Sequence, residues 1–302
     1  MKLVDQLVGL IRETSSSLPE DVLSALKSAA AREEKGSSAS VVLETVLDNC
    51  RLAKKTGLPL CQDTGTLTFF VDERLRRKVT PAVLKAAVAE ATARGFLRKN
   101  CIDSVDGRSY DDNCAEGAPV VHYVTAGPGR NGEEDVPTVT LLLKGGGSEN
   151  MSRQYSLPDA ALGAGRDLAG VRRCVLDAVQ KIQGYGCAPG ILGVCIGGDR
   201  ATGYEVAKEQ LLRPLDEAED DSGCTRREIA FASLGELEST LLEEANALGV
   251  GPMGLGGRTT LLGVKVAARP RVPASFFVTV AYMCWACRRR TLRIGVRATK
   301  GA

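Results

Sequence analysis

The sequence contains a single histidine, His122. A histidine-rich metal site or an ordinary Ser-His-Asp triad would therefore depend on this one side chain. His122 lies in the stretch Pro-Val-Val-His-Tyr-Val-Thr, whose composition predicts a strand, and we interpret it as a structural residue. The chemistry of this protein must then rest on other residue types.

The chain also lacks an excess of charge of one sign and any long apolar run. Its 39 basic and 37 acidic residues are spread along the sequence and give a net charge of +2. This balance argues against a surface for nucleic acid or anionic membranes. No apolar run reaches the roughly 18 residues of a membrane span, and the N-terminus does not resemble a signal peptide. We expect a cytoplasmic protein with no nucleic-acid or membrane partner.

Hydrophobic residues make up 44% of the 302 residues, enough to bury a sizeable core. The ten cysteines would suit disulfides only in an oxidising compartment. We interpret Cys50, Cys174 and Cys195 as small buried apolar residues, because each lies within an apolar periodic stretch. Cys101, Cys114, Cys224 and Cys287 receive no assignment.

Three further cysteines, Cys61, Cys187 and Cys284, stand at chain bends beside glycine, proline or polar residues. Their spacing is too long for a zinc knuckle and too scattered for a local ferredoxin loop. It suits a cluster held by three thiolates from distant parts of one fold. A four-iron cluster with three thiolate ligands leaves one iron open, and such an iron is a Lewis acid that can take a substrate oxygen.

The periodicity predicts an α+β (mixed α/β) protein forming one domain over 1–302, with a helical subregion at about 1–100 and an α/β subregion at about 101–302. Capping patterns at Ser17–Glu20, Ser40 and Thr80-Pro81 predict three early helices. Later helices are expected at about 168–183, 204–212 and 233–247, a turn near 127–134 and an acidic loop at 216–223. The predicted strands are Leu67–Val71, Val120–Thr125, Thr138–Leu143, Ile191–Ile196, Thr260–Ala267 and Phe276–Met283.

The stretch Cys61-Gln62-Asp63-Thr64-Gly65 brings a thiol, an amide, a carboxylate and a hydroxyl together. A carboxylate at this place could relay protons near a metal. Alternatively, Asp63 could form an Asx-type turn with the local backbone N–H groups.

Two glycine-rich stretches are candidate anion sites. Lys144–Arg153 contains three glycines whose backbone N–H groups could approach a carboxylate or phosphate, with a flexible loop as the alternative. Gly251–Thr260 is the nearest approach to a P-loop, but Pro252 stands where the first glycine should be and Arg258 replaces the lysine. A tight packed turn is favoured there over a nucleotide site.

Taken together, five motifs resemble the class I (iron–sulfur) fumarase and L-tartrate dehydratase family, specifically its α subunit or N-terminal half. The resemblance covers roughly Val42 to Arg290. The motifs occur in the family's order: Pro-Leu-Cys-Gln-Asp-Thr-Gly-Thr, Lys-Gly-Gly-Gly-Ser-Glu-Asn-Met-Ser-Arg, Gly-Cys-Ala-Pro-Gly, Leu-Gly-Val-Gly-Pro-Met-Gly-Leu-Gly-Gly and Cys-Trp-Ala-Cys-Arg-Arg.

The resemblance implies a [4Fe–4S] hydro-lyase that adds water to, or removes it from, a small dicarboxylate, fumarate/malate first and tartrate second. The cluster ligands would be Cys61, Cys187 and Cys284, with Cys284 preferred to Cys287. Gln62 and Asp63 would face the substrate, with Asp63 a candidate proton donor to the leaving hydroxyl. The substrate carboxylates would be held by Arg98, Gly147, Asn150 and Arg153.

The sequence departs from the family at two places. Val272 stands where the family usually has a histidine expected to touch the site, and Asn113–Pro119 also differs from the usual motif. In this family the remaining catalytic groups belong to a β subunit or C-terminal half, so we expect a hetero-oligomer with a β subunit. The alternatives are a cluster-binding subunit with altered or lost activity and, less favoured, a nucleotide-binding protein using Gly251–Thr260.

Overall fold

The computed structural model describes residues 2–125, 136–216 and 233–295. The chain groups into two compact units, each built from segments that lie apart in the sequence and on both sides of residue 100. In the part that the structure describes, no helix is both long and apolar enough to cross a bilayer. The first unit contains 1–19, 49–145 and 288–302, and the second contains 20–48 and 146–287.

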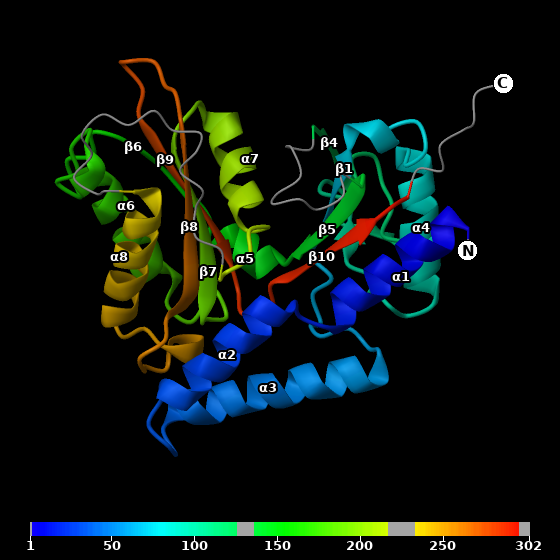
Figure 1. Cartoon of the computed structure of the whole chain (residues 1–302), viewed down its shortest axis with the longest axis horizontal. Coiled ribbons are helices and arrows are strands. Elements are labelled where there is room, and N and C mark those ends of the chain that lie inside the picture. The colour runs from blue at the N-terminus through cyan, green and yellow to red at the C-terminus, as the bar shows by residue number, and fades with distance from the viewer. Residues whose placement is uncertain (1, 126–135, 217–232, 296–302) are drawn as a thin grey trace. The chain divides into compact units, whose positions relative to one another are not determined.

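The first unit is a four-stranded sheet with strand order β10-β5-β1-β4 (Figure 1). Strand β1 pairs in parallel with β4 and antiparallel with β5. The helix α3 (Ser38–Thr56) runs from the second unit into the first. The elements of the first unit are α1 (Leu3–Ser16), β1 (Thr66–Asp72), η1 (Glu73–Leu75), α4 (Pro81–Ala93), β2 (Cys101–Ile102), β3 (Ser109–Tyr110), β4 (Val120–Val124), β5 (Thr138–Lys144) and β10 (Arg288–Arg293).

The core of the first unit lies between one face of this sheet and the helices α1 and α4. Leu67, Phe69 and Val71 alternate along β1, so all three point to the same face, and they join Leu141 and Leu143 of β5 in one buried cluster. The helix α4 begins where the sequence predicts, because the Val83 N–H donates to the hydroxyl of the N-cap residue Thr80 over 3.4 Å.

The second unit is built on a sheet with strand order β6-β9-β7-β8, in which β7 is parallel to β8 and antiparallel to β9. Its elements are α2 (Glu20–Arg32), α5 (Gly146–Asn150), β6 (Arg153–Ser156), α6 (Leu168–Ile182), β7 (Gly190–Gly197), α7 (Arg200–Gln210), α8 (Leu234–Ala247), η4 (Pro252–Gly254), β8 (Leu261–Arg269) and β9 (Phe277–Met283).

Helices cover both faces of the second sheet, as Figure 1 shows. On one face, Val194 and its neighbours form a buried cluster with α6 and α8. On the other face, α7 lies so close to β7 that a Cβ on Gly193 would stand 2.0 Å from the Ala207 carbonyl oxygen. The two buried faces explain why β7 is buried along its whole length.

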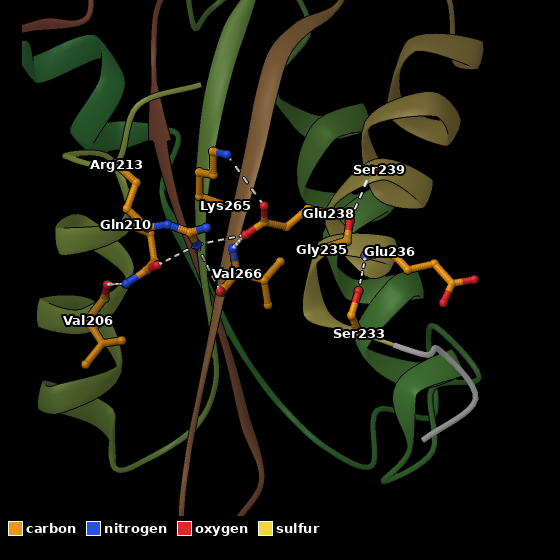
Figure 2. Close-up of polar contacts among 10 residues, drawn as sticks. All are labelled: Val206, Gln210, Arg213, Ser233, Gly235, Glu236, Glu238, Ser239, Lys265 and Val266. Carbon is orange, nitrogen blue, oxygen red and sulfur yellow. Dashed lines mark hydrogen bonds and ion pairs between the residues drawn. The ribbon is translucent and has the colours of Figure 1, made fainter. Parts of the chain in front are cut away.

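A charged network closes the outer edge of β8 (Figure 2). The Glu238 carboxylate accepts the Val266 N–H over 2.7 Å and pairs with Arg213 at 2.8 Å and with Lys265 at 3.6 Å. Arg213 also donates to the Val266 carbonyl over 3.4 Å and to Gln210 over 3.2 Å. Because β8 is an edge strand, the N–H and carbonyl of Val266 would otherwise be open to pairing with a strand of another chain, and this network satisfies both groups.

The mixed α+β class predicted from the sequence is confirmed, and every predicted strand is present to within a few residues. Lys144–Arg153 is not simply a glycine-rich bend, because it contains the short helix α5. The helix expected at about 204–212 begins at Arg200, since Asp199 caps it by accepting the N–H groups of Ala201 and Thr202. The turn near 127–134, Cys224 and, except for Asp216, the acidic loop at 216–223 lie outside the described residues.

Candidate functional site

In the first unit, Cys61 stands in a short loop between α3 and β1. The loop is anchored at Leu60, whose carbonyl accepts the Asn49 amide over 3.0 Å and whose N–H donates to Ser15 over 2.8 Å. The Asp63 N–H points at the Cys61 sulfur over 3.5 Å, and Gln62 is exposed beside it. A backbone amide directed at sulfur is a contact that also supports a metal-bound sulfur, so the loop is suited to a ligand cysteine.

The Asp63 carboxylate is fixed beside Cys61. Its Oδ1 accepts the Gly65 N–H and the Asn100 side-chain amide, each over 2.8 Å. The Asx-type turn considered from the sequence is therefore present, and it orients the carboxylate rather than excluding a role for it. A Cβ on Gly145 would lie 2.9 Å from Asp63 Oδ2, so the absence of a side chain there lets the carboxylate sit against the end of β5.

Arg98 has a firmly held backbone and an exposed side chain. The Thr64 hydroxyl bonds both to the Arg98 carbonyl, over 2.7 Å, and to the Arg98 N–H, over 2.9 Å. The amide of Asn113, which is fully buried, donates to the same carbonyl over 3.0 Å, and its Oδ1 accepts the N–H groups of Asn100 and Cys101. The first unit thus brings Cys61, Gln62, Asp63 and Arg98 together.

Replacing Asn113 with alanine should destabilise the first unit by about 1–3 kcal/mol, because the N–H groups of Asn100 and Cys101 and the Arg98 carbonyl would each lose a hydrogen bond to a buried amide. Alanine would also be strained at the φ of 59° that Asn113 adopts. The Asn113→Gly variant relieves that strain but loses the same bonds, so it should lie between alanine and wild type in urea unfolding. Equal stability of all three chains would contradict the assigned role.

In the second unit, Cys187 is exposed on the loop between α6 and β7 and has a φ of 51°. The loop is held by η4 and its flanking glycines, because the Met253 N–H donates to the Ala188 carbonyl over 2.9 Å. A Cβ on Gly254 would stand 2.6 Å from the Gly184 nitrogen, so only glycine permits this approach. The glycine-rich turn therefore supports the Cys187 loop.

The same contacts argue against the nucleotide-binding alternative for Gly251–Thr260. A phosphate site needs backbone N–H groups that point outward. Here the amides of Gly251, Gly254 and Gly256 donate within the turn, and the Arg258 N–H donates to both carboxylate oxygens of Glu33 at 3.0 and 2.9 Å. A buried carboxylate at this place would repel a phosphate, and the packed turn favoured from the sequence is what the structure contains.

Cys284 directly follows β9 and is tied to both α5 and the Cys187 loop. Its N–H donates to the Ser148 hydroxyl of α5 over 3.1 Å. The N–H of the next residue, Trp285, points at the Cys187 carbonyl over 3.4 Å. The motif Lys-Gly-Gly-Gly-Ser therefore provides a backbone anchor for a predicted ligand as well as a candidate anion site.

The residues predicted to hold carboxylates in the second unit lie on α5 and at the start of β6. Gly147 and Asn150 are exposed on α5. Arg153 opens β6 opposite Val280 of β9, and its Nε is buried without a hydrogen-bond partner among the described residues. An unpaired buried guanidinium nitrogen favours an anionic ligand nearby.

Tyr282 packs against Gly186 and Gly190 of the Cys187 loop and stands two residues before Cys284, and it was not singled out from the sequence. Its side chain is fully buried, and the structure describes no hydrogen-bond partner for its hydroxyl. Burial raises the pKa of Tyr282 well above its usual value, and the charges of Cys284 and Cys187 raise this pKa further. The hydroxyl is therefore a donor at neutral pH.

The cysteines interpreted as apolar packing differ from the three predicted ligands. Burial raises the pKa of Cys50 to about 11, of Cys174 to about 12 and of Cys195 to about 11. All three are buried, so their thiols keep their protons at neutral pH. A protonated buried thiol is neither a metal ligand nor a nucleophile.

Sequence reasoning missed the residues that position the site. Asn100 and Asn113 in the first unit, and Ser148 and Tyr282 in the second, act through hydrogen bonds or packing against segments distant in the sequence. Ser148 lies within the glycine-rich motif Lys144–Arg153, and Asn113 lies within the stretch that departs from the family motif. Nothing local to Tyr282 distinguishes it from any other residue of a buried strand.

The comparisons with known proteins cover nearly the whole chain. The family model described as fumarate hydratase (Fumerase) matches residues 4–293. The chain belongs to this family. It is 45% identical over 97% of its length to a protein of Geobacillus stearothermophilus provisionally named fumarate hydratase class I, and it spans 55% of that protein.

Two further relatives carry the name of a subunit. The chain is 31% identical over 99% of its length to a Methanocaldococcus jannaschii protein provisionally named L(+)-tartrate dehydratase subunit alpha, and covers 99% of it. It is 29% identical over 97% of its length to the L(+)-tartrate dehydratase subunit alpha of Escherichia coli strain UTI89, and covers 91% of it. The resemblance inferred from the five motifs is confirmed.

The residues of each unit fit the iron–sulfur group that the family implies. Among the described residues, no three His, Cys, Asp or Glu side chains are already grouped to hold a metal ion. Cys61 belongs to the first unit and Cys187 and Cys284 to the second, so the three-thiolate ligand set stays a prediction. Within the units, the amide directed at Cys61 and the unpaired Tyr282 hydroxyl beside the Cys187 loop both suit a negatively charged sulfur centre.

Proposed function

We propose that this chain is the α-type part of a [4Fe–4S] hydro-lyase that reversibly adds water to a small dicarboxylate, with fumarate/malate as the first candidate substrate and tartrate as the second. The observation that carries this proposal is the Asp63 carboxylate, fixed beside Cys61 in a chain of the fumarate hydratase family. Such a carboxylate is the group that proton transfer to a leaving hydroxyl requires.

Cys61, Cys187 and Cys284 would hold the cluster. When bound, the cluster supplies a Lewis acid that polarises an oxygen of the substrate. The backbone near each predicted ligand is fixed by another segment. Leu60 beside Cys61 is bonded by Asn49, Ala188 beside Cys187 is bonded by Met253, and Cys284 itself donates to Ser148.

Asp63 is proposed to give the proton to the departing hydroxyl and to recover it in the reverse reaction. Its Oδ1 accepts the N–H groups of Gly65 and Asn100, and its Oδ2 faces Gly145. Gln62 is exposed next to it and could orient the substrate through its amide. Asn100 would keep the carboxylate in place during the transfer.

The substrate's carboxylates are proposed to bind Arg98, Gly147, Asn150 and Arg153. Arg98 suits this role because its backbone is pinned by Thr64 and Asn113 while its guanidinium is exposed. A guanidinium fork binds a carboxylate through two parallel hydrogen bonds, which fixes orientation as well as affinity. The exposed N–H groups and amide of α5 would contact the same or the second carboxylate.

A β subunit, or an equivalent second half, is proposed to complete the site. Two of the relatives are named as alpha subunits, and the chain spans about half of the Geobacillus protein. Val272 is 64% exposed on the β8–β9 loop, so the place where the family usually carries a histidine lies at the surface of this chain. A partner that covers this loop could supply the missing group.

The test is hydration of fumarate by the chain, reconstituted with iron and sulfide without oxygen, together with its β-type partner. The loss of fumarate absorbance should report turnover. Asp63→Asn keeps the shape of the side chain but cannot transfer the proton, and should lower kcat by about 10²–10⁴-fold.

The matched control is Asp111→Asn, because the Asp111 side chain is 79% exposed and pairs only with Lys99 among the contacts described. It should retain wild-type turnover. No turnover of fumarate, malate or tartrate by a complex with a full complement of iron would refute the proposed activity and favour a cluster-binding subunit without it.

A further inference from the structure

The buried hydroxyl of Tyr282 is one of the polar groups of the second unit that have no partner among the described residues. The side chain is 0% exposed at the end of β9, two residues before Cys284, and its oxygen has no hydrogen-bond partner in the part of the chain described. Buried polar groups in native proteins are nearly always hydrogen-bonded, because burial removes their bonds to water. We therefore expect this hydroxyl to donate to an acceptor that is not among the described residues.

The loop that carries Cys187 is fitted around this ring. A Cβ on Gly186 would stand 2.5 Å from the Cε1 atom of Tyr282, and a Cβ on Gly190 would stand 2.5 Å from the hydroxyl oxygen. Any side chain at either position would collide with the tyrosine. The two glycines flank Cys187, so the close fit fixes the ring against the ligand-bearing loop.

Backbone hydrogen bonds also fix the segments that carry Tyr282, Cys284 and Cys187. The Tyr282 N–H donates to the Ser152 hydroxyl over 3.1 Å, and the Cys284 N–H donates to Ser148 over the same distance. The Trp285 N–H reaches back to the Cys187 carbonyl. The Tyr282 hydroxyl is a hydrogen-bond donor without an acceptor, and a thiolate or sulfide sulfur can accept such a bond.

We propose that the Tyr282 hydroxyl donates a hydrogen bond to sulfur of the iron–sulfur centre held by Cys187 and Cys284, and thereby raises the reduction potential of that centre. The inference rests on the proposed function. Hydrogen bonds to the sulfurs of such a centre stabilise the extra negative charge of the reduced state, and this is one of the ways in which a protein tunes its potential.

The test compares Tyr282→Phe with Tyr155→Phe in the full chain, with and without the cluster. Tyr155 is a matched control, because it is also buried in this core but its hydroxyl has a partner, donating to Asp177 over 2.7 Å. Iron and sulfide content, potentiometric titration and urea unfolding are measured for both variants and for wild type.

In the loaded chain, Tyr282→Phe should bind the same iron as wild type and shift the potential to a more negative value, whereas Tyr155→Phe should leave the potential unchanged. Without the cluster, Tyr282→Phe should unfold at the wild-type urea concentration or above it, because it removes an unpaired buried hydroxyl. Tyr155→Phe should unfold at a lower concentration, because it removes a hydrogen bond.

Two results would overturn the inference alone: an unchanged potential in loaded Tyr282→Phe, or a loss of stability in its cluster-free form as large as that of Tyr155→Phe. The second result would mean that the hydroxyl has a partner within the chain. A wild-type chain that takes up no iron under any reconstitution would instead refute the proposed function, and this inference with it.

Discussion

The Cys187→Ser variant should lose the bound cluster and the turnover that depends on it, and Cys61→Ser should do the same. A serine hydroxyl keeps the size of the side chain but does not give the thiolate that a four-iron cluster requires. The measurements are the iron and sulfide content per chain after anaerobic reconstitution, and the visible absorbance of the reconstituted protein. The expected effect is loss of both signals to background.

The controls are cysteines close in sequence but buried among apolar side chains. Cys195→Ala is the control for Cys187, and Cys50→Ala is the control for Cys61; Cys195 and Cys50 are 0% and 6% exposed. Both control variants should keep a full complement of iron. Since Cys187 is exposed, its replacement should also leave urea unfolding of the cluster-free chain unchanged, which separates ligand loss from misfolding. Full iron content in both Cys187→Ser and Cys61→Ser would remove the basis of the proposed chemistry.

Much of the fold could be predicted because its signals are local. Thr80-Pro81 caps α4 and Ser233 caps α8 where the sequence indicates, since a side-chain oxygen that accepts an N–H three residues on needs no tertiary information. The buried runs of β7 and β9 were likewise recognisable, because strands covered on both faces are continuously apolar.

Other elements could not be predicted because distant segments decide them. The strand β10, Arg288–Arg293, carries four arginines and has no strand signature of its own; it forms because β5 offers it an antiparallel partner from Thr138 to Leu143. The short helix α5 contains two glycines and forms where Ser148 is held against Cys284. Local propensity is a weak guide where tertiary contacts supply the energy.

The candidate site divides in the same way. The chemically distinctive residues, Cys61, Asp63 and Cys187, stood out because thiols and carboxylates beside glycine or proline are unusual in a packed chain. The residues that orient them did not, because an amide such as Asn113 becomes informative only when its four partners are known. The sequence therefore indicates which groups react and leaves their positioning to the three-dimensional structure.

The network at the edge of β8 leads to the largest expected effect on stability. Replacing Glu238 with alanine would leave Arg213 and Lys265 buried without their common carboxylate, and the Val266 N–H without its acceptor. Breaking a buried ion pair from one side costs about 3–5 kcal/mol, because the remaining charge stays desolvated. Urea unfolding should show this loss, whereas Glu243→Gln on the exposed side of the same helix should change stability by less than about 0.5 kcal/mol.

The loss of stability in Glu238→Ala should also depend on pH, in a direction that the charge of Lys265 determines. Burial lowers the pKa of Lys265 from its ordinary value of 10.5, and the negative charge of Glu238 opposes that shift. Removing Glu238 should therefore lower the pKa of Lys265 further. A lysine whose folded-state pKa is lowered costs stability while it is charged, and this cost fades as the pH rises from the lowered pKa towards the unfolded value. The difference in unfolding free energy between Glu238→Ala and wild type should therefore become smaller from neutral to alkaline pH. A difference that stays constant would show that the buried lysine charge is not its cause.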